Sequence, residues 1–530
     1  MTDFRVLTRP LSAAPLVRMA LTGDAPDGWY AALPEGAEEW QARAESVRRD
    51  FAGQDWLGAL EGAFAASGPA AERLARVGGG AGVVVTTGQQ PGLFGGPIYT
   101  FSKALTALAL ADALERATGI PTAPVFWAAT YDADFVEASI THVAVGASVE
   151  RLQMDPPAVP GLEMSDTPLG DVATLVRELE RAAGSAADPA VLELVRRAYD
   201  PGATVGSAFV ALMRALLEPL GVAVLDAAHP SVRAAERPLM LKALRRAALV
   251  DEALLERERE MRSRGHAPQV AHVEGLSLVF AVERGERERI PIAPAEGVAG
   301  EAGTGSARLE PNVLLRPVAE RAILPTVAYA AGPGEIGYFA QASAVAAALE
   351  ASEPLAVPRW SGLIVEPHVC RILDRTGLEV DDLANADGTL GRLARERLPE
   401  QVRSALGGYR AALERAAEEL SAAVAGAGAS LVPEEVLLGA RNSIGHRLDR
   451  LERRVLAAWK RKHESLVRDI ETARASLFPL GRPQERILNL VPMLARHGEA
   501  LFTAMLAEAR EHATSLVRGT VAEDRRAIHR

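Results

Sequence analysis

Cysteine is the scarcest functional residue in this sequence, because Cys370 is its one thiol. A single cysteine excludes an intrachain disulfide and any zinc site built from Cys₄ or Cys₂His₂ ligands. The 10 histidines are scattered, and none stands in an H-x-x-x-H pattern. We therefore expect no structural zinc.

Long apolar runs and an excess of positive charge are also missing. No run reaches the roughly 18 apolar residues of a membrane span. Residues 1–5 lack the basic and apolar stretch of a secretory signal. With the single cysteine, these absences predict a cytoplasmic protein without a membrane partner. The net charge of −11 argues against a nucleic-acid partner, which draws on surplus Lys and Arg.

Lysine is rare among the 58 basic residues, which are nearly all arginine. A lysine inside a motif is therefore somewhat more informative than usual, although a chance survivor is the alternative. Lys103 is the one that stands beside a glycine-rich motif.

The sequence does contain an alternation of apolar strands and helices. Runs typical of buried strands occupy residues 82–86, 123–128, 221–226 and 325–330, with helical periodicity between them. This alternation predicts an α/β fold with a parallel sheet covered on both faces. We predict that this core spans residues 1–390, with insertions at about 150–205 and 267–306.

The second insertion has the pattern of a small antiparallel sheet. Short strands are expected at Gln269–His272, Leu276–Glu283 and Glu288–Ile292, separated by polar turns. The Gly- and Ala-rich stretch Gly297–Ser306 is predicted to be a surface loop.

The last third of the chain changes to heptad periodicity. Apolar residues at 402, 406, 409, 413, 416 and 420 are spaced alternately by four and three, and the pattern resumes from Ile444 after a Gly/Pro break. We predict an antiparallel coiled-coil hairpin at 391–475. Helices at 476–530 are expected to pack back on the core.

The strongest candidate for ligand binding is a glycine-rich loop between a strand and a helix. Its glycines allow close backbone approach, and the following helix favours an anion at its N-terminus. Lys103 on that helix could reach a phosphate or carboxylate. The loop is neither a Walker A nor a G-x-G-x-x-G motif, and a tight turn without a ligand is the alternative. The candidate ligand-binding residues here are Gly88, Gln89, Gln90, Gly92, Gly95 and Gly96.

A second Gly-containing turn also joins a strand to a helix. Gly332, Gly334, Glu335 and Tyr338 belong to it. Two such turns at strand ends are expected to border one crevice of an open α/β sheet. Glu335 could bind an ammonium or a ribose hydroxyl, or could simply cap its helix.

Further candidates carry charge close to apolar runs. Asp132 and Asp134 follow a strand and could bind an amine or Mg²⁺, or act as a base, with solvated turn carboxylates as the alternative. Asn312 and Arg316 flank an apolar run, and Arg359 follows another. Each arginine could hold a substrate carboxylate or form an internal salt bridge.

In this order the motifs resemble the bacillithiol-biosynthesis cysteine ligase family (bacillithiol synthase). The likeness spans nearly the whole chain. It is carried by residues 84–97 with Tyr99 and Lys103, 124–127 with Asp132 and Asp134, 311–317, 324–335, and 477–489.

The resemblance implies a Rossmann-like core similar to class I aminoacyl-tRNA synthetases and a homodimer formed through the coiled coil. It implies that cysteine is joined to the amine of glucosaminyl-malate, the last step of bacillithiol synthesis. ATP or ADP binding is associated with the family.

The sequence departs from the family pattern at two places. Tyr131 and Ala133 stand where Glu and His are usual, and Glu320 and Arg321 replace a Gln-Asp pair. A histidine base at position 133 is excluded in this chain. No H-x-G-H or K-M-S-K-S motif is visible, so a standard synthetase adenylation site is not indicated.

Our functional hypothesis is therefore a ligase that forms a carbon–nitrogen bond. Lys103, Asp132 and Asp134 are its candidate catalytic residues, and an activated cysteine carboxylate is the expected intermediate. A nucleotidyltransferase that uses the same loop and a nucleotide-binding coiled-coil interaction protein are the alternatives.

Overall fold

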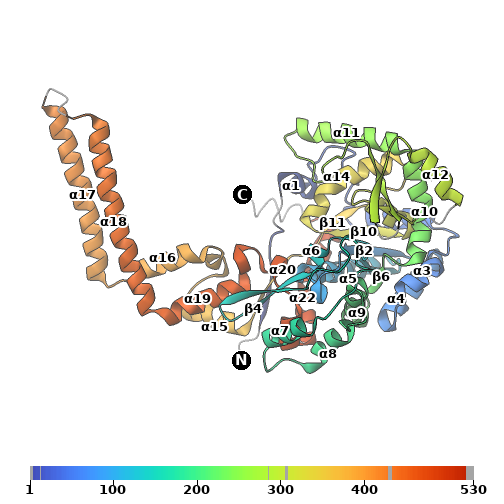
Figure 1. Cartoon of the computed structure of the whole chain (residues 1–530), viewed down its shortest axis with the longest axis horizontal. Helices are drawn as coiled ribbons and strands as arrows, with labels where there is room; N and C mark the ends of the chain where they lie inside the picture. Colours follow the sequence, from blue (N-terminus) through green and yellow to red (C-terminus); the bar gives the residue numbers. More distant parts are fainter. Residues whose placement is uncertain (1–3, 12–13, 284–285, 305–307, 428–431, 521–530) are drawn as a thin grey trace. The chain divides into compact units, whose positions relative to one another are not determined.

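The computed structural model describes residues 4–11, 14–283, 286–304, 308–427 and 432–520. They form two compact units (Figure 1). The α/β unit comprises the described parts of residues 5–143, 150–364 and 484–530, and the helical unit consists mainly of residues 365–483. No helix among the described residues is long and apolar enough to cross a membrane.

A five-stranded sheet forms the centre of the α/β unit. Every neighbouring pair of its strands is parallel, which confirms the predicted fold class. The order across the sheet is β11 (Ala356–Pro358), β10 (Thr326–Ala331), β2 (Val83–Gln89), β3 (Thr122–Ala128) and β6 (Ala223–Asp226). The strands are nearly continuous apolar runs because both faces of the sheet are covered.

The strand order creates a switch point at the middle of the sheet. From β2 the chain crosses through α5 (Ile98–Thr118) to β3 on one side, whereas β10 lies on the other side of β2. The loops that follow β2 and β10 therefore diverge at the carboxyl edge of the sheet. Open α/β sheets bind ligands in the crevice at such a point.

Helix α5 is apolar around most of its circumference because it is enclosed. One side packs against β2, β3 and β10, and another packs against α22 (Glu499–Arg518) from the end of the described chain. The other helices of this unit are α1 (Pro15–Thr22), α2 (Ala37–Asp50), α3 (Trp56–Phe64), α4 (Gly68–Val77), α6 (Phe135–Ala138), α7 (Ala173–Ala183), α8 (Pro189–Ala198), α9 (Val205–Leu217), α10 (Pro230–Arg245), α11 (Ala247–Ser263), α12 (Ala295–Thr304), α13 (Arg316–Ile323), α14 (Pro333–Ala348), α20 (Gln484–Ile487) and α21 (Val491–His497).

The predicted antiparallel insertion is confirmed, with one difference. Its sheet has the order β8 (Glu286–Pro291), β7 (Leu276–Glu283) and β9 (Arg308–Pro311). The expected strand at Gln269–His272 was wrong, because this segment has no strand partner. Instead, the Gln341 side chain donates to the Val270 carbonyl and accepts from its N–H, which satisfies the backbone without a sheet.

The predicted surface loop at Gly297–Ser306 was also wrong, because residues up to Thr304 belong to helix α12. Alanine is the best helix former, and its methyl groups pack well. Ala295 and Ala299 are buried in the apolar cluster around α10, and this packing offsets the helix cost of the glycines. Residues 305 and 306 lie outside the described residues.

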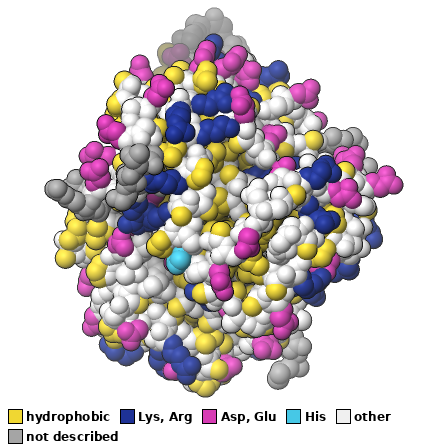
Figure 2. Space-filling model, turned by 90° about the vertical axis from the view of Figure 1, so that its right-hand side faces the viewer, with side chains coloured by type: hydrophobic (Ala, Val, Ile, Leu, Met, Phe, Trp, Pro, Cys, Tyr) yellow, Lys and Arg dark blue, Asp and Glu magenta, His cyan; other side chains and the backbone are white. Residues whose placement is uncertain are grey.

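Two further sheets have two strands each. One pairs β4 (Ile140–Val145) with β5 (Ser148–Gln153), and the other pairs β1 (Arg5–Thr8) with β12 (Gly362–Val365). On the face of the molecule in Figure 2, acidic, basic and apolar side chains are interspersed, and several Lys and Arg side chains gather in its upper part.

The helical unit contains the long hairpin of the heptad segment. Its helices are α15 (Pro367–Thr376), α16 (Ala386–Glu396), α17 (Glu400–Gly426), α18 (Glu434–Lys462) and α19 (Glu464–Leu477). α17 packs against α18, and Arg410 bonds to Asp449 and Glu452 across the pair. Residues 428–431 of the expected Gly/Pro turn lie outside the described residues.

One buried acid in the α/β unit gives the fold a testable pH dependence. Glu236 on α10 is 3% exposed, and its Oε1 has no hydrogen-bond partner. Burial, followed by the nearby charge of Glu310, raises the pKa of Glu236 to about 8. The folded protein therefore keeps this proton at pH values where the unfolded chain has lost it.

We predict that Glu236→Gln flattens the pH dependence of stability. In the wild type, the protonated Glu236 contributes to the free energy of unfolding. This contribution is fully present below about pH 4.5 and is lost as pH rises towards 8, at up to ~1.4 kcal/mol per pH unit. The variant has no proton to lose, so its free energy of unfolding should fall less between pH 5 and pH 8. Urea titrations at both values check this; identical declines in the two proteins would contradict it.

Candidate active site

A cavity of 620 Å³ opens at the carboxyl ends of β2, β3 and β10, beside the switch point. Its volume suits a small-molecule ligand. Most residues that the sequence analysis selected line it, namely Gly88, Gln89, Gln90, Tyr99, Lys103, Asp132, Asn312, Arg316, Gly332, Gly334, Glu335, Tyr338 and Arg359.

Gly92, Gly95 and Gly96 were expected to contact the ligand but do not line this cavity. They let the loop fold on itself: a Cβ on Gly92 would lie 2.8 Å from the Gly96 Cα, and Gly95 has a φ of +87°. The Nδ2 of Asn489 donates to the carbonyls of Leu93, Phe94 and Gly96. These three glycines therefore shape the loop, and the C-terminal segment holds that shape.

The two candidate aspartates have different positions. Asp132 lines the cavity, where its Oδ2 accepts from Gln90 at 2.5 Å and its Oδ1 accepts from the Asp134 N–H at 2.7 Å. Asp134 lies outside the cavity lining and caps α6 by accepting from the Glu137 N–H. Asp132 is therefore the better-placed base.

Lys103 is nearly buried, and its ammonium group is surrounded by acceptors. Its Nζ lies 2.8 Å from the Gly88 carbonyl, 2.9 Å from Gln89 Oε1 and 2.6 Å from Glu335 Oε2. An ammonium group has three N–H donors, so all of them are occupied. Lys103 thus connects the loop after β2 with the start of α14, and it leaves no N–H for a phosphate.

Glu335 caps its helix, which was one of the two alternatives that the sequence left open, and it also pairs with a lysine of the protein itself. It bonds to Lys103, and it also accepts from the Gly332 N–H at 2.7 Å as a cap of α14. Burial lowers the pKa of Lys103, and the charge of Glu335 opposes this change. For Glu335 the effect of burial is outweighed by Lys103, so the pKa of this carboxyl falls. The 2.6 Å contact between Lys103 and Glu335, with three acceptors around the ammonium group, is typical of an ion pair.

Arg316 forms the internal salt bridge that was one of its two alternatives. Its Nη1 lies 3.0 Å from Glu320 Oε2, and its Nη2 donates to the Tyr338 hydroxyl. Burial lowers the pKa of Arg316, but Tyr329, Tyr338 and Glu320 raise it more strongly. The departure at Glu320 therefore supplies a buried counter-ion.

Arg359 is likewise held by an internal carboxylate. It forms a bidentate pair with Glu485 of α20, at 2.8 and 2.6 Å. Its Nε is buried without a partner and lies near Gly332 at the cavity. One N–H of this tightly fixed guanidinium thus remains for a ligand.

Several cavity residues were not selected from the sequence. Two of them are aromatic residues whose polar atoms are buried without a partner, Trp127 Nε1 and Tyr131 Oη. Buried polar groups normally have partners, so these two donors in the cavity lining are candidate ligand contacts. The remaining unselected polar or aromatic residues of the lining are Phe280, Arg287, Arg289, Tyr329 and Arg486.

A divalent metal at Asp132 and Asp134 was one alternative from the sequence. Among the described residues, no group of three or more His, Cys, Asp or Glu side chains could hold a metal ion. The geometry of the aspartate pair instead matches hydrogen bonding to Gln90 and to the turn backbone.

Comparison with known proteins covers both units. Residues 28–360 match the family model described as "Bacillithiol biosynthesis BshC, N-terminal Rossmann-like domain". Residues 362–516 match "Bacillithiol biosynthesis BshC, C-terminal coiled-coil domain". Residue 361 separates the two matches, and residues 1–27 and 517–530 lie outside them.

Curated relatives carry the name "Putative cysteine ligase BshC". The protein of Solibacter usitatus is 33% identical over 87% of this chain and 88% of its own. That of Koribacter versatilis is 33% identical over 81% of each chain, and that of Salinibacter ruber is 30% identical over 79% of each. With a Rossmann-like domain, a coiled-coil domain and these relatives, the chain belongs to the bacillithiol biosynthesis BshC family.

Proposed function

We propose that the chain is a cysteine ligase that joins the carboxyl group of L-cysteine to the amine of glucosaminyl-malate. The product is an amide, and the reaction is the last step of bacillithiol synthesis in the cytoplasm. Support comes from the relatives named as cysteine ligases. The observation that carries the proposal is the position of Asp132 in a cavity of substrate size.

Asp132 differs from the other acid of the cavity lining in its partners. Glu335 is neutralised by Lys103, whereas Asp132 bonds only to an amide and a backbone N–H. Its carboxyl group therefore has no cationic partner among the described residues and has lone pairs for an incoming ammonium group. A carboxylate in this state can bind the sugar amine and accept its proton.

Amide formation from a free carboxylate requires activation, and ATP is the simplest activating agent. In our proposal the cysteine carboxylate attacks ATP and becomes an acyl-adenylate, with release of pyrophosphate, or an acyl-phosphate, with release of ADP. The sugar amine then attacks the acyl carbon, Asp132 accepts the proton, and AMP or phosphate leaves. The Arg359 Nε and the arginines of the lining supply positive charge for the anionic groups of these ligands.

Purified protein with cysteine and glucosaminyl-malate should give the cysteinyl amide only when ATP is added. Mass spectrometry detects the product, because its mass equals that of both substrates minus water. AMP or ADP in the same mixture identifies the activated intermediate. Absence of the amide with every nucleoside triphosphate would refute the proposed reaction.

The two aspartates offer a matched pair of variants. Asp132→Asn should lower kcat by about 10²–10⁴-fold, because the amide cannot accept the proton. Asp134→Asn should remain close to wild type, since Asn also caps helices and this side chain lies outside the cavity lining. Steady-state kinetics with both variants tests the assignment, and equal losses would contradict it.

The coiled-coil hairpin supports the proposed homodimer. Helix α17 has no buried residue, and its Tyr409 and Leu420 side chains are 58% and 54% exposed. Helix α18 also has exposed apolar side chains. Apolar exposure of this kind along a heptad pattern favours a further helix partner. A second copy of the chain satisfies it with twofold symmetry.

Tyr409→Glu/Leu420→Glu should therefore convert a dimer into a monomer while the helix content is retained. Light scattering after size exclusion gives the mass, and circular dichroism checks the helices. Glu418→Gln, a change at an exposed charged position of the same helix, serves as the control. A monomeric wild type, or a double variant of unchanged mass, would show that the hairpin is not the dimer interface.

A further inference from the structure

The three-stranded sheet presents a charged face to the cavity. Phe280 on β7 lies opposite Arg289 of β8 on one side and opposite Glu310 of β9 on the other. Directly opposed residues of antiparallel strands share a face, as do residues two apart on one strand. Arg287 therefore lies on the same face, beside Arg289. Phe280, Arg287 and Arg289 all line the cavity.

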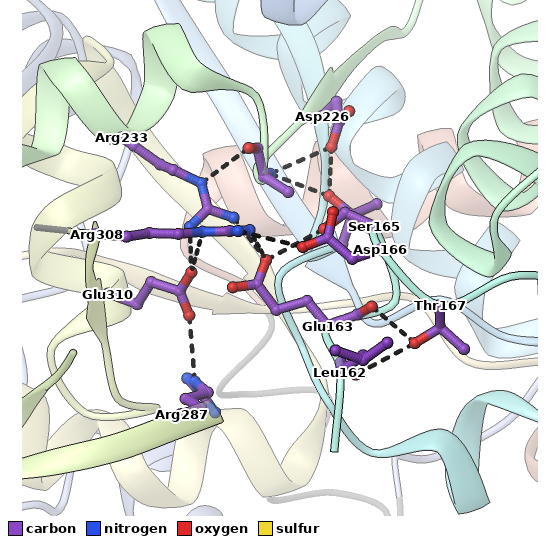
Figure 3. Close-up of polar contacts among 12 residues, drawn as sticks. Leu162, Glu163, Ser165, Asp166, Thr167, Asp226, Arg233, Arg287, Arg308 and Glu310 are labelled. Atoms are coloured by element: carbon purple, nitrogen blue, oxygen red, sulfur yellow. Dashed lines mark hydrogen bonds and ion pairs between the residues drawn. The ribbon is translucent and has the colours of Figure 1, made fainter. Parts of the chain in front are cut away.

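A buried ion cluster fixes this sheet against the rest of the α/β unit. Glu310 contacts Arg233 of α10 and Arg308, and these two arginines also bond to Glu163 (Figure 3). Figure 3 shows Arg287 on the opposite side of Glu310, where its Nε donates to the free carboxylate oxygen at 3.2 Å. Glu310 of this cluster thus holds the Nε of Arg287 in place.

Both terminal nitrogens of Arg287 and the Nη1 of Arg289 have no protein acceptor among the described residues. Arg287 uses only its Nε on Glu310, and its guanidinium stacks 3.8 Å from the centre of the Phe280 ring. Arg289 donates from Nε and Nη2 to the carbonyls of Ser277 and Leu276, and no described carboxylate lies within ion-pair distance of it. Arg316 and Arg359 differ, because protein groups accept from both of their terminal nitrogens.

The Tyr131 hydroxyl is a second, independent observation in the lining of this cavity. Tyr131 is only 6% exposed, and its Oη has no hydrogen-bond partner. Tyr131 lines the same cavity as Arg287 and Arg289. A buried O–H without an acceptor is costly unless a ligand supplies one.

We propose that Arg287, Arg289 and Tyr131 form an oxyanion subsite that binds a carboxylate or phosphate group of a substrate. Guanidinium groups bind such groups through paired N–H donors, and the hydroxyl supplies a further donor. The inference rests on the proposed function for the identity of the substrates. The oxyanion comes either from the malate part of the sugar substrate or from the nucleotide.

Direct binding measurements separate the two sources. Titration calorimetry on the full chain would use glucosaminyl-malate, ATP, and methyl glucosaminide, which lacks the malate carboxylates. Arg289→Gln and Arg287→Gln should each lower the affinity for one of the two anionic ligands by about tenfold to a hundredfold. The ligand whose affinity falls is the source of the oxyanion. The affinity for methyl glucosaminide should stay unchanged.

Two further variants keep the test independent of folding. Tyr131→Phe removes only an unsatisfied hydroxyl, so thermal stability without ligand should be equal or higher while the same anion binds more weakly. A purely structural role would not give this opposite pair of changes. Arg259→Gln, at an exposed position of α11, should bind every ligand like the wild type.

The subsite would be refuted if both anions bound Arg289→Gln and Arg287→Gln as tightly as the wild type. It would also be refuted if neither anion bound the wild-type chain. Arginine-dependent binding without amide formation would retain the subsite and reject the ligase function. If the amide forms and neither arginine affects binding, the ligase function is retained and the subsite is rejected.

Discussion

The cavity depends on the three contacts made by the Lys103 ammonium group. These contacts join the loop after β2 to the helix after β10. They lie at the switch point of the sheet, where the loops that follow these two neighbouring strands diverge. Removing one partner of a buried ion pair leaves the other charge uncompensated, at a typical cost of ~3–5 kcal/mol. Lys103 therefore adds to the pairing of β2 with β10 in holding the two glycine-containing turns together, and we propose that it is a positioning residue.

The polar groups around the cavity fall into two sets. Arg316 and Arg359 are neutralised by buried carboxylates and hold the walls together. Asp132 and Arg287 line the cavity with lone pairs or N–H donors to spare, and the buried Nε of Arg359 has no partner. Rigid ion pairs behind the wall and incompletely bonded groups on it describe a preorganised site, in which binding does not require the protein dipoles to rearrange.

The sequence predicted the sheet, the hairpin and the two glycine-containing turns, because each depends on local periodicity or local backbone freedom. It could not decide whether Arg316 and Arg359 bind a ligand or a protein carboxylate. Their partners, Glu320 and Glu485, are identified only by folding. Arg287 and Arg289 were missed because alternating Glu and Arg on a short strand is also typical of a solvated edge. The α12 helix was missed because packing of its alanines overrides its glycine content.

In the proposed reaction the sugar amine meets the activated cysteine in this cavity. A crystal structure of the protein with bound glucosaminyl-malate would show whether it does. We expect density for the ligand in the cavity, with the amine nitrogen roughly 3 Å from an oxygen of Asp132. A ligand bound elsewhere, or an amine directed away from Asp132, would contradict the assignment.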